Sequence, residues 1–245
     1  MALRLEHFSE LDSTNEEARR RALAGERGPL WIRADRQGAG RGRRGRAWIS
    51  EPGNLFITGL YVLDTQAGDA ARLSFAAALA VADLVGEAAP GLNPRLKWPN
   101  DVLIEGRKVC GILLESGAAP GGGLWLAAGI GVNLAHHPED SERPATSLAA
   151  HGAKADPAHA GERLAHHFDI WLQRWQVSGF APIRDAWLAR AHGLGERVVA
   201  RLENETVEGI FADLMPDGAL RLDLADGTRR LISAGDVFFP ANQQG

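Results

Sequence analysis

The sequence has little cysteine, and this scarcity narrows the class of protein. A single cysteine stands among 245 residues, so no internal disulfide can form. Chains that depend on disulfides belong mostly to oxidising compartments, and the composition therefore predicts a cytoplasmic protein. The sequence also lacks an apolar run of the roughly 20 residues that span a bilayer. Its first residues, MALRLEHFSE, carry charges where a secretory signal would be apolar, so no membrane partner is expected.

A general excess of positive charge is lacking as well. The chain has 27 lysines and arginines against 31 acidic residues, which gives a formal net charge of -4 at pH 7. The isoelectric point of about 6.1 lies well below the value of about 9 that is typical of nucleic-acid-binding domains. Basic charge is therefore a local feature of this chain. The length suits one large domain, or one domain with a small appendage.

The hydrophobic pattern predicts a mixed α/β domain over residues 1–192 and a small β-barrel over residues 193–245. Capping residues and apolar residues at helical spacing predict helices over 14–24, 69–89 and 157–192. Apolar and β-branched runs between turn residues predict strands at 29–35, 54–63, 95–98, 102–104, 109–115 and 124–133. After Gly193, short apolar runs alternate with the turns MPDG and ADGT, a pattern typical of a small barrel.

Residues 37–48, QGAGRGRRGRAW, gather glycine and arginine between two predicted strands. The stretch GRGRRG matches the dinucleotide-binding fingerprint, but that fingerprint must open a helix, and the residues that follow are aromatic and β-prone. A nucleic-acid contact, a solvated loop and a clamp on the phosphates of a small ligand remain as interpretations. Glycine allows close approach of the backbone, and arginine grips phosphate with two hydrogen bonds, so the clamp is favoured.

A second polar cluster lies in RLKWPNDVLIEGRKVCGILLES, residues 95–116. Lys97 and Trp98 are expected on opposite faces of a strand. Asn100 and Asp101 are expected in the next turn, where their oxygens suit a phosphate-bound Mg²⁺. Gly111, inside an apolar run, indicates close approach of a ligand or another backbone. An ordinary hairpin with solvated lysines is an equally good interpretation of this segment by itself.

Other candidates for chemistry are weaker. Cys110 has apolar neighbours and is expected to be a buried structural thiol. The histidine pairs at 136–137 and 166–167 are adjacent in sequence and do not share a face, so no metal site is expected there. The stretch GIGVNL at 129–134, taken alone, is best explained as a tightly packed strand.

Five motifs, taken in order, resemble the biotin protein ligase family: DSTN, RQGAGRGRRGRAW, KWPND, KVCGILLE and GIGVN, within about residues 11–134. The segment from about residue 193 is similar to that family's SH3-like C-terminal domain. The resemblance implies an α+β fold, in which helices flank a mixed sheet like that of class II aminoacyl-tRNA synthetases. A small C-terminal SH3-like β-barrel would follow this sheet.

The resemblance also implies a reaction in two steps. The carboxylate of biotin attacks the α-phosphate of ATP, in the presence of Mg²⁺, and gives biotinoyl-5′-AMP and pyrophosphate. A lysine of a biotin carboxyl carrier domain then takes the biotinoyl group and releases AMP. Cationic donors lower the barrier where a carboxylate meets a triphosphate. A loop that closes over the mixed anhydride also excludes water, which accounts for the arginines of residues 37–48.

Carried over by position, the family's biotin contacts fall on Ser13, Thr14, Asn15, Gln37, Gly40, Arg41, Gly42, Lys108, Gly111 and Ile112. The contacts with ATP or the adenylate fall on Arg41, Arg43, Arg44, Arg46, Trp48, Lys97, Asn100 and Asn133. Lys108 would contact the biotin carboxylate and the α-phosphate, and it is the first candidate for a catalytic residue. Arg43 is the second catalytic candidate and would retain the adenylate, and Asp101 would lie on the Mg²⁺ side of the pocket.

Some members of that family carry an N-terminal winged helix-turn-helix that binds DNA. Here the ligase motifs begin by residue 11, so a monofunctional ligase without specific DNA binding is expected. The sequence does not decide whether two chains pair their sheet edges to form a homodimer. A lipoate or octanoate ligase is the alternative enzyme, and the arginine-rich loop argues for biotin. An RNA-binding module is the alternative of another class, but it leaves Lys97, Lys108 and the Asn-Asp pair unexplained.

Overall fold

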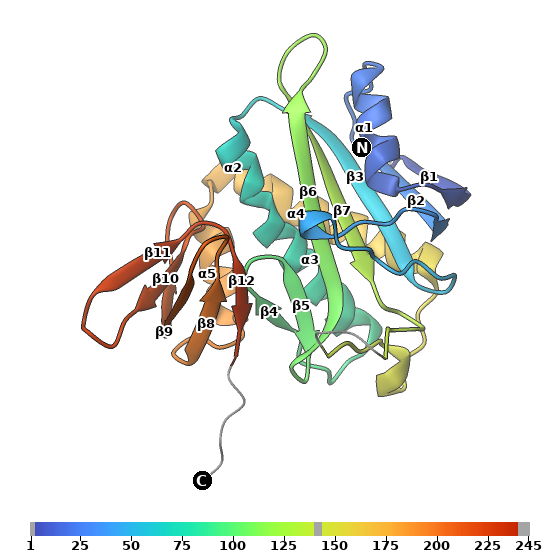
Figure 1. Cartoon of the computed structure of the whole chain (residues 1–245). Helices are drawn as coiled ribbons and strands as arrows, with labels where there is room; N and C mark the ends of the chain where they lie inside the picture. Colours follow the sequence, from blue (N-terminus) through green and yellow to red (C-terminus); the bar gives the residue numbers. More distant parts are fainter. Residues whose placement is uncertain (1–2, 140–143, 240–245) are drawn as a thin grey trace.

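The computed structural model describes residues 3–139 and 144–239. A large sheet with helices on both faces stands beside a smaller sheet built from the C-terminal residues (Figure 1). The predicted barrel extends to residue 245, so residues 240–245 of that prediction lie outside the described part of the chain.

The large sheet has seven strands in the order β1-β2-β3-β7-β6-β5-β4. Strands β1 and β2 run parallel, whereas every other neighbouring pair is antiparallel, so the expectation of a mixed sheet is confirmed. The strands are β1 (Leu5–Leu11), β2 (Leu30–Gln37), β3 (Leu55–Leu63), β4 (Arg95–Lys97), β5 (Asp101–Ile104), β6 (Arg107–Ala118) and β7 (Leu124–Val132).

Side chains along β2 alternate between two hydrophobic cores, one on each face of the large sheet. Leu30 and Ile32 pack in the same core as Ala18 of the first helix. Trp31 points to the other face, where its ring centroid lies 5.6 Å from that of Phe168. Helix α1 (Thr14–Leu23) packs on the face of Leu30 and Ile32. The other helices are α2 (Ala67–Ala71), α3 (Leu73–Ala88), α4 (Pro157–Ser178) and α5 (Ala181–Ala189). Over residues 3–139 and 144–239, no helix combines the length and apolarity needed to cross a membrane.

Several sequence predictions are corrected by the structure. The helix expected over 69–89 divides into α2 and α3 at Arg72, and the one expected over 157–192 breaks at Gly179, whose φ is +69°. Strand β1 was not predicted, because charged residues obscure its apolar alternation. Ser13 is the N-cap residue of α1 by its backbone, but its side chain makes no capping hydrogen bond. Asp101 begins β5 instead of lying in the turn.

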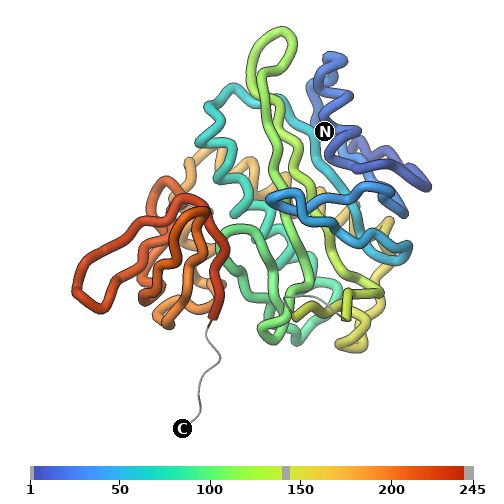
Figure 2. The backbone as a smooth tube through the Cα atoms, in the orientation of Figure 1, coloured from blue at the N-terminus to red at the C-terminus, as the bar shows by residue number. Residues whose placement is uncertain are grey.

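The smaller sheet is antiparallel throughout, with five strands in the order β11-β10-β9-β8-β12, as an SH3-like domain requires. Figures 1 and 2 show β12 on the side of this sheet that faces the large sheet. The two units are joined by side-chain contacts, and the Trp98 indole N–H donates to the Gly218 carbonyl at 3.1 Å. The strands are β8 (Arg197–Arg201), β9 (Thr206–Leu214), β10 (Leu220–Asp223), β11 (Arg229–Ile232) and β12 (Asp236–Phe238).

Candidate active site

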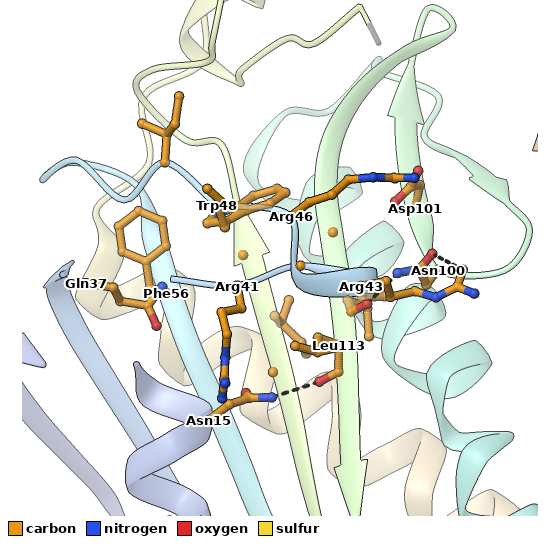
Figure 3. Close-up of a pocket in the computed structure, with 18 of the residues that line it drawn as sticks. Asn15, Gln37, Arg41, Arg43, Arg46, Trp48, Phe56, Asn100, Asp101 and Leu113 are labelled. Carbon is orange, nitrogen blue, oxygen red and sulfur yellow. Dashed lines mark hydrogen bonds between the residues drawn. The ribbon is translucent and has the colours of Figure 1, made fainter. Parts of the chain in front are cut away.

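A pocket of about 290 Å³ opens on the α1 face of the large sheet, under the segment of residues 37–48 (Figure 3). Its walls come from the start of α1, that segment, strands β3, β5, β6 and β7, and one residue of β12. The structure brings together most of the predicted site residues here: Ser13, Thr14, Asn15, Gln37, Arg41, Gly42, Arg43, Arg46, Trp48, Asn100, Asp101, Lys108, Gly111, Ile112 and Asn133.

The floor of the pocket is a patch of sheet with few side chains. Gly111 of β6 pairs with Gly131 of β7, and Gly129 lies two residues away on the same face. A Cβ at Gly131 would lie 2.6 Å from Cε2 of Trp48, and a Cβ at Gly129 would overlap the side-chain oxygen of Asn15. Glycine is required at these positions because other residues must lie directly on the backbone of the sheet. We call Gly111, Gly129 and Gly131 the glycine floor.

One end of the pocket is lined by the uncharged polar side chains of Thr14, Asn15 and Gln37, and Thr58 lies fully buried behind them. We call these four residues the neutral end. The backbone N–H and the hydroxyl of Thr14 donate to Oε1 of Gln37 at 2.9 and 3.1 Å. The Thr58 hydroxyl lies 2.7 Å from Oδ1 of Asn15, whose Nδ2 donates to Oε2 of Glu115 at 2.8 Å. Mutual hydrogen bonds fix these rotamers, so the neutral end is preorganised for a polar, uncharged group.

The opposite end holds Arg43, Arg46, Asp101 and Lys108, and we call it the charged end. Nζ of Lys108 lies 2.5 Å from Oδ1 of the buried Asp101. Nη1 of Arg43 donates to Oδ1 of Asn100 at 3.2 Å. Burial lowers the pKa of the Arg43 guanidinium, and the nearby carboxylates oppose this shift; the group stays protonated at neutral pH, because arginine starts from so high a pKa. The cationic groups of Lys108 and Arg43 are therefore held in position by the protein before any ligand binds.

Three arginines of residues 37–48 differ in their acidic partners. Arg41 points toward the neutral end, beside Asn15 in Figure 3, and its Nη2 donates to Glu16 at 3.1 Å. Arg44 and Arg46 instead contact Oδ2 of Asp236 at 3.4 and 2.5 Å. Asp236 lines the pocket, yet the sequence did not indicate it. Its segment fits an ordinary strand, and no local spacing links it to a loop so distant in the chain.

Two more residues of this region were missed from the sequence. Phe56 lines the pocket, and Thr58 lies buried behind Thr14 and Asn15. Both belong to β3, where the register places them opposite Gly129 and Gly131. Two side chains on one strand therefore face the two glycines of the next. Period-two alternation along β3 could have marked them as sharing a face, but not as facing a pocket.

Three predicted site residues lie outside the pocket walls, namely Gly40, Arg44 and Lys97. Gly40 packs against Ser50 and the Trp48 carbonyl, which would lie 2.6 and 2.7 Å from a Cβ at this position. The Lys97 ammonium lies 5.7 Å from the ring centroid of Phe238, on the seam with the smaller sheet. Alternation explains this placement, because Trp98 turns to the other side and is buried.

Trp48 lies against the glycine floor, and Nζ of Lys108 is 5.4 Å from its ring centroid. The indole N–H is buried and meets no acceptor among the described residues. Behind the floor, Cys110 is fully buried, and burial raises the pKa of its thiol. The expectation of a buried structural thiol is confirmed.

The carboxylate of Asp101 at the charged end suits a metal ion whose other ligands are phosphate oxygens and water. The described residues contain no group of three His, Cys, Asp or Glu side chains that could hold a metal ion by themselves. Mg²⁺ in nucleotide sites usually binds one or two carboxylates together with phosphates and water. Asp101, which lines the pocket, fits that smaller requirement.

Comparison with known proteins bears on this pocket directly. A model of the "Biotin/lipoate A/B protein ligase family" matches residues 10–133, which include the motifs that build most of the pocket. The chain belongs to this family. A second model, "Biotin protein ligase C terminal domain", matches residues 193–239.

Within this family, the chain is 46% identical to a biotin–[acetyl-CoA-carboxylase] ligase of Paracoccus denitrificans. The match covers 93% of this chain and 97% of that relative. It is 35% identical to a bifunctional ligase/repressor of Bacillus subtilis over 82% of this chain, and it spans 63% of that relative's length.

Solved structures of biotin protein ligases share the fold. The ligase of Aquifex aeolicus in complex with biotin and ATP superposes with a TM-score of 0.82 at 26% identity, covering 96% of this chain and 97% of that one. The ligase of Leishmania major in complex with biotinyl-5-AMP gives a TM-score of 0.68 at 26% identity. That match covers 96% of this chain and all of the other. The α+β fold with an SH3-like C-terminal sheet is thereby confirmed.

Proposed function

We propose that the protein is an ATP-dependent biotin protein ligase. It forms biotinoyl-5′-AMP and transfers the biotinoyl group to a lysine of the biotin carboxyl carrier domain of an acetyl-CoA carboxylase. The observation that carries this proposal is a single pocket with a neutral end and a charged end joined by the glycine floor. Such a pocket matches a substrate with an uncharged polar head, an apolar middle and a carboxylate that must reach a nucleotide.

In this proposal the ureido head of biotin binds at the neutral end. A ureido group both donates and accepts hydrogen bonds, as do the side chains of Asn15 and Gln37. The apolar part of biotin packs against Phe56 and Leu113, which line the pocket. The carboxylate then faces Lys108, so the reacting oxygen is held by contacts made elsewhere on the substrate.

The charged end performs the adenylation. Lys108 donates to the oxygens on which negative charge develops, and Asp101 holds its ammonium in place before the substrates bind. Arg43 contributes a second cation and retains the adenylate. Asp101 would hold Mg²⁺ that arrives with ATP, and the ion would supply neutralisation of phosphate charge. Both nucleophiles belong to substrates. The biotin carboxylate attacks the α-phosphorus of ATP and displaces pyrophosphate. The carrier lysine then attacks the acyl carbon and displaces AMP.

The remaining assignments follow the same family likeness. We assign residues 1–192 to the catalytic domain and residues 193–245 to the SH3-like domain. We also propose that the protein acts in the cytoplasm, which its cysteine content supports. Absence of sequence-specific DNA binding stays a prediction, and a gel-shift assay with the operator of a biotin gene would test it.

ATP–pyrophosphate exchange with Mg²⁺ tests the proposal, with biotin, lipoate and octanoate supplied in separate reactions. We expect exchange with biotin alone. Exchange with lipoate or octanoate in place of biotin would retain the adenylation chemistry and assign the protein to the lipoate branch of its family. No exchange with any of the acids would refute adenylation, and salt-dependent oligonucleotide binding would then be measured.

A further inference from the structure

The C-terminal unit places one buried carboxylate inside the pocket of the large sheet. Asp236 is the first residue of β12, and its side chain is only 8% exposed. Both Arg44 and Arg46 contact Oδ2 of this carboxylate, while their own side chains are nearly half exposed. The preceding carbonyl, that of Gly235, accepts a hydrogen bond from Nη1 of Arg43 at 3.4 Å. Two consecutive residues of the C-terminal unit therefore contact three arginines of the loop.

These contacts offset two costs that the loop carries. Four arginines within six residues repel one another, because their charges have the same sign. Arg44 also adopts φ of +56°, a left-handed conformation that disfavours any residue with a Cβ. The carboxylate of Asp236 reduces the repulsion between the arginines. Its contact with Arg44 also holds the turn Arg43–Gly45 in a shape that requires the left-handed conformation of Arg44. Without it, the loop has less reason to keep this conformation.

The same contacts direct Arg43 toward the charged end. Its guanidinium is held between Asn100, on the large sheet, and the carbonyl of Gly235, on the C-terminal unit. Arg46 crosses the pocket toward the side of Asp101 in Figure 3. The loop is therefore fixed at its arginine tips by residues of both units.

We infer that Asp236 is a positioning residue, which holds the arginine loop closed over the charged end so that Arg43 retains the adenylate. The inference rests on the proposed function for its kinetic consequences, but not for the structural one. Asp236 acts on substrates through the arginines and supplies no group to the reaction. The C-terminal unit thereby controls the leakage of an intermediate that forms on the other unit.

The structural consequence is tested on ligand-free protein by limited trypsin digestion, with mass spectrometry to locate the cuts. Asp236→Asn keeps the size of the side chain and removes its charge, so we expect cleavage after residues 41–46 to become about tenfold faster, as local opening increases. Glu205→Gln is the matched control, because Glu205 pairs with Arg230 on the surface of the same unit. An unchanged rate for Asp236→Asn, or an equal rise for the control, would refute the inference even if the protein proved not to be a biotin ligase.

The kinetic consequence separates positioning from general destabilisation. For Asp236→Asn, we expect the KM for ATP to rise about tenfold, the KM for biotin to change by less than about twofold, and biotin to appear on serum albumin added as a bystander. Arg43→Gly sets the scale for full leakage. Arg46→Ala should leak as Asp236→Asn does, and the double variant should leak no more, since the two residues form one unit. A lower KM for ATP in Asp236→Asn, or an equal loss of affinity for both substrates without leakage, would overturn the inference.

Discussion

The two ends of the pocket are built on different physical principles. At the neutral end, Thr14, Asn15 and Thr58 are almost fully buried and bond to one another and to Gln37. At the charged end, the Arg46 side chain is nearly half exposed and meets the buried carboxylate of Asp236. A buried, satisfied network has one arrangement and rejects groups that do not match it. A half-exposed guanidinium has further N–H donors to offer an anionic ligand while it stays paired with its carboxylate. We therefore expect the neutral end to select the carboxylic acid substrate, and the charged end to stabilise the charge that develops during adenylation.

The largest expected effect comes from the charged end. Lys108→Ala should cost about 2–4 kcal/mol of transition-state stabilisation, roughly 30- to 1000-fold in the adenylation rate, because one preorganised donor is lost. Pre-steady-state formation of the adenylate is the measurement. Lys154→Ala, at an exposed lysine away from the pocket, is the control. Near-normal adenylation by Lys108→Ala would remove this residue from the mechanism.

Two glycines of β7 allow the contacts of Asn15 and of Trp48 to be disturbed one at a time. Gly129→Ala places a methyl group on Asn15, and Gly131→Ala places one on Trp48. Overpacking of this kind costs about 1–3 kcal/mol. We expect the first variant to raise the KM for biotin and the second to raise the KM for ATP. Thermal melting of both variants, with Gly86→Ala as a control whose added methyl meets nothing within 4 Å, distinguishes a damaged end from a damaged fold. Equal effects on both substrates would show that the ends are not independent.

A smaller effect is expected from the neutral end when its backbone is left intact. Thr58→Val keeps the shape of the side chain and removes the hydroxyl beside Asn15. The loss of one hydrogen bond in a buried network corresponds to about 0.5–1.5 kcal/mol, roughly two- to tenfold in the KM for biotin. Thr58→Ser should restore most of this affinity. If valine and serine behave alike, the hydroxyl does not organise the neutral end.

The smallest effect concerns the layer beneath the floor. Burial raises the pKa of the Cys110 thiol, so the reactive thiolate is disfavoured in the folded protein. Near pH 8, Ellman's reagent should label Cys110 only after unfolding, and Cys110→Ala should leave both KM values unchanged. Rapid labelling of the native protein would indicate that the floor opens, and the ends would then share a flexible base.

Local patterns in the sequence predicted much of this molecule, and long-range contacts account for what they missed. The start of α1, the glycine-rich segment and the strand that contains Gly111 could all be located from spacing and turn residues. The position of Lys97 outside the pocket walls could not be predicted, because alternation fixes opposite faces but not which face meets the pocket. Asp236 was missed because its role arises only when the C-terminal sheet packs against the loop. The break at Gly179 is local, because this glycine adopts φ of +69°, and it was missed because the apolar pattern continues across it.

The pocket is assembled from residues that are far apart in the order of synthesis, from Ser13 to Asp236. A growing chain emerges N-terminus first, and domains tend to fold as they appear. The glycine floor and the neutral end can therefore form while the last strand is still being made, whereas the charged end gains its final carboxylate only with β12. During translation the chain would acquire a place for its acid substrate before it acquires the means to confine a reactive product.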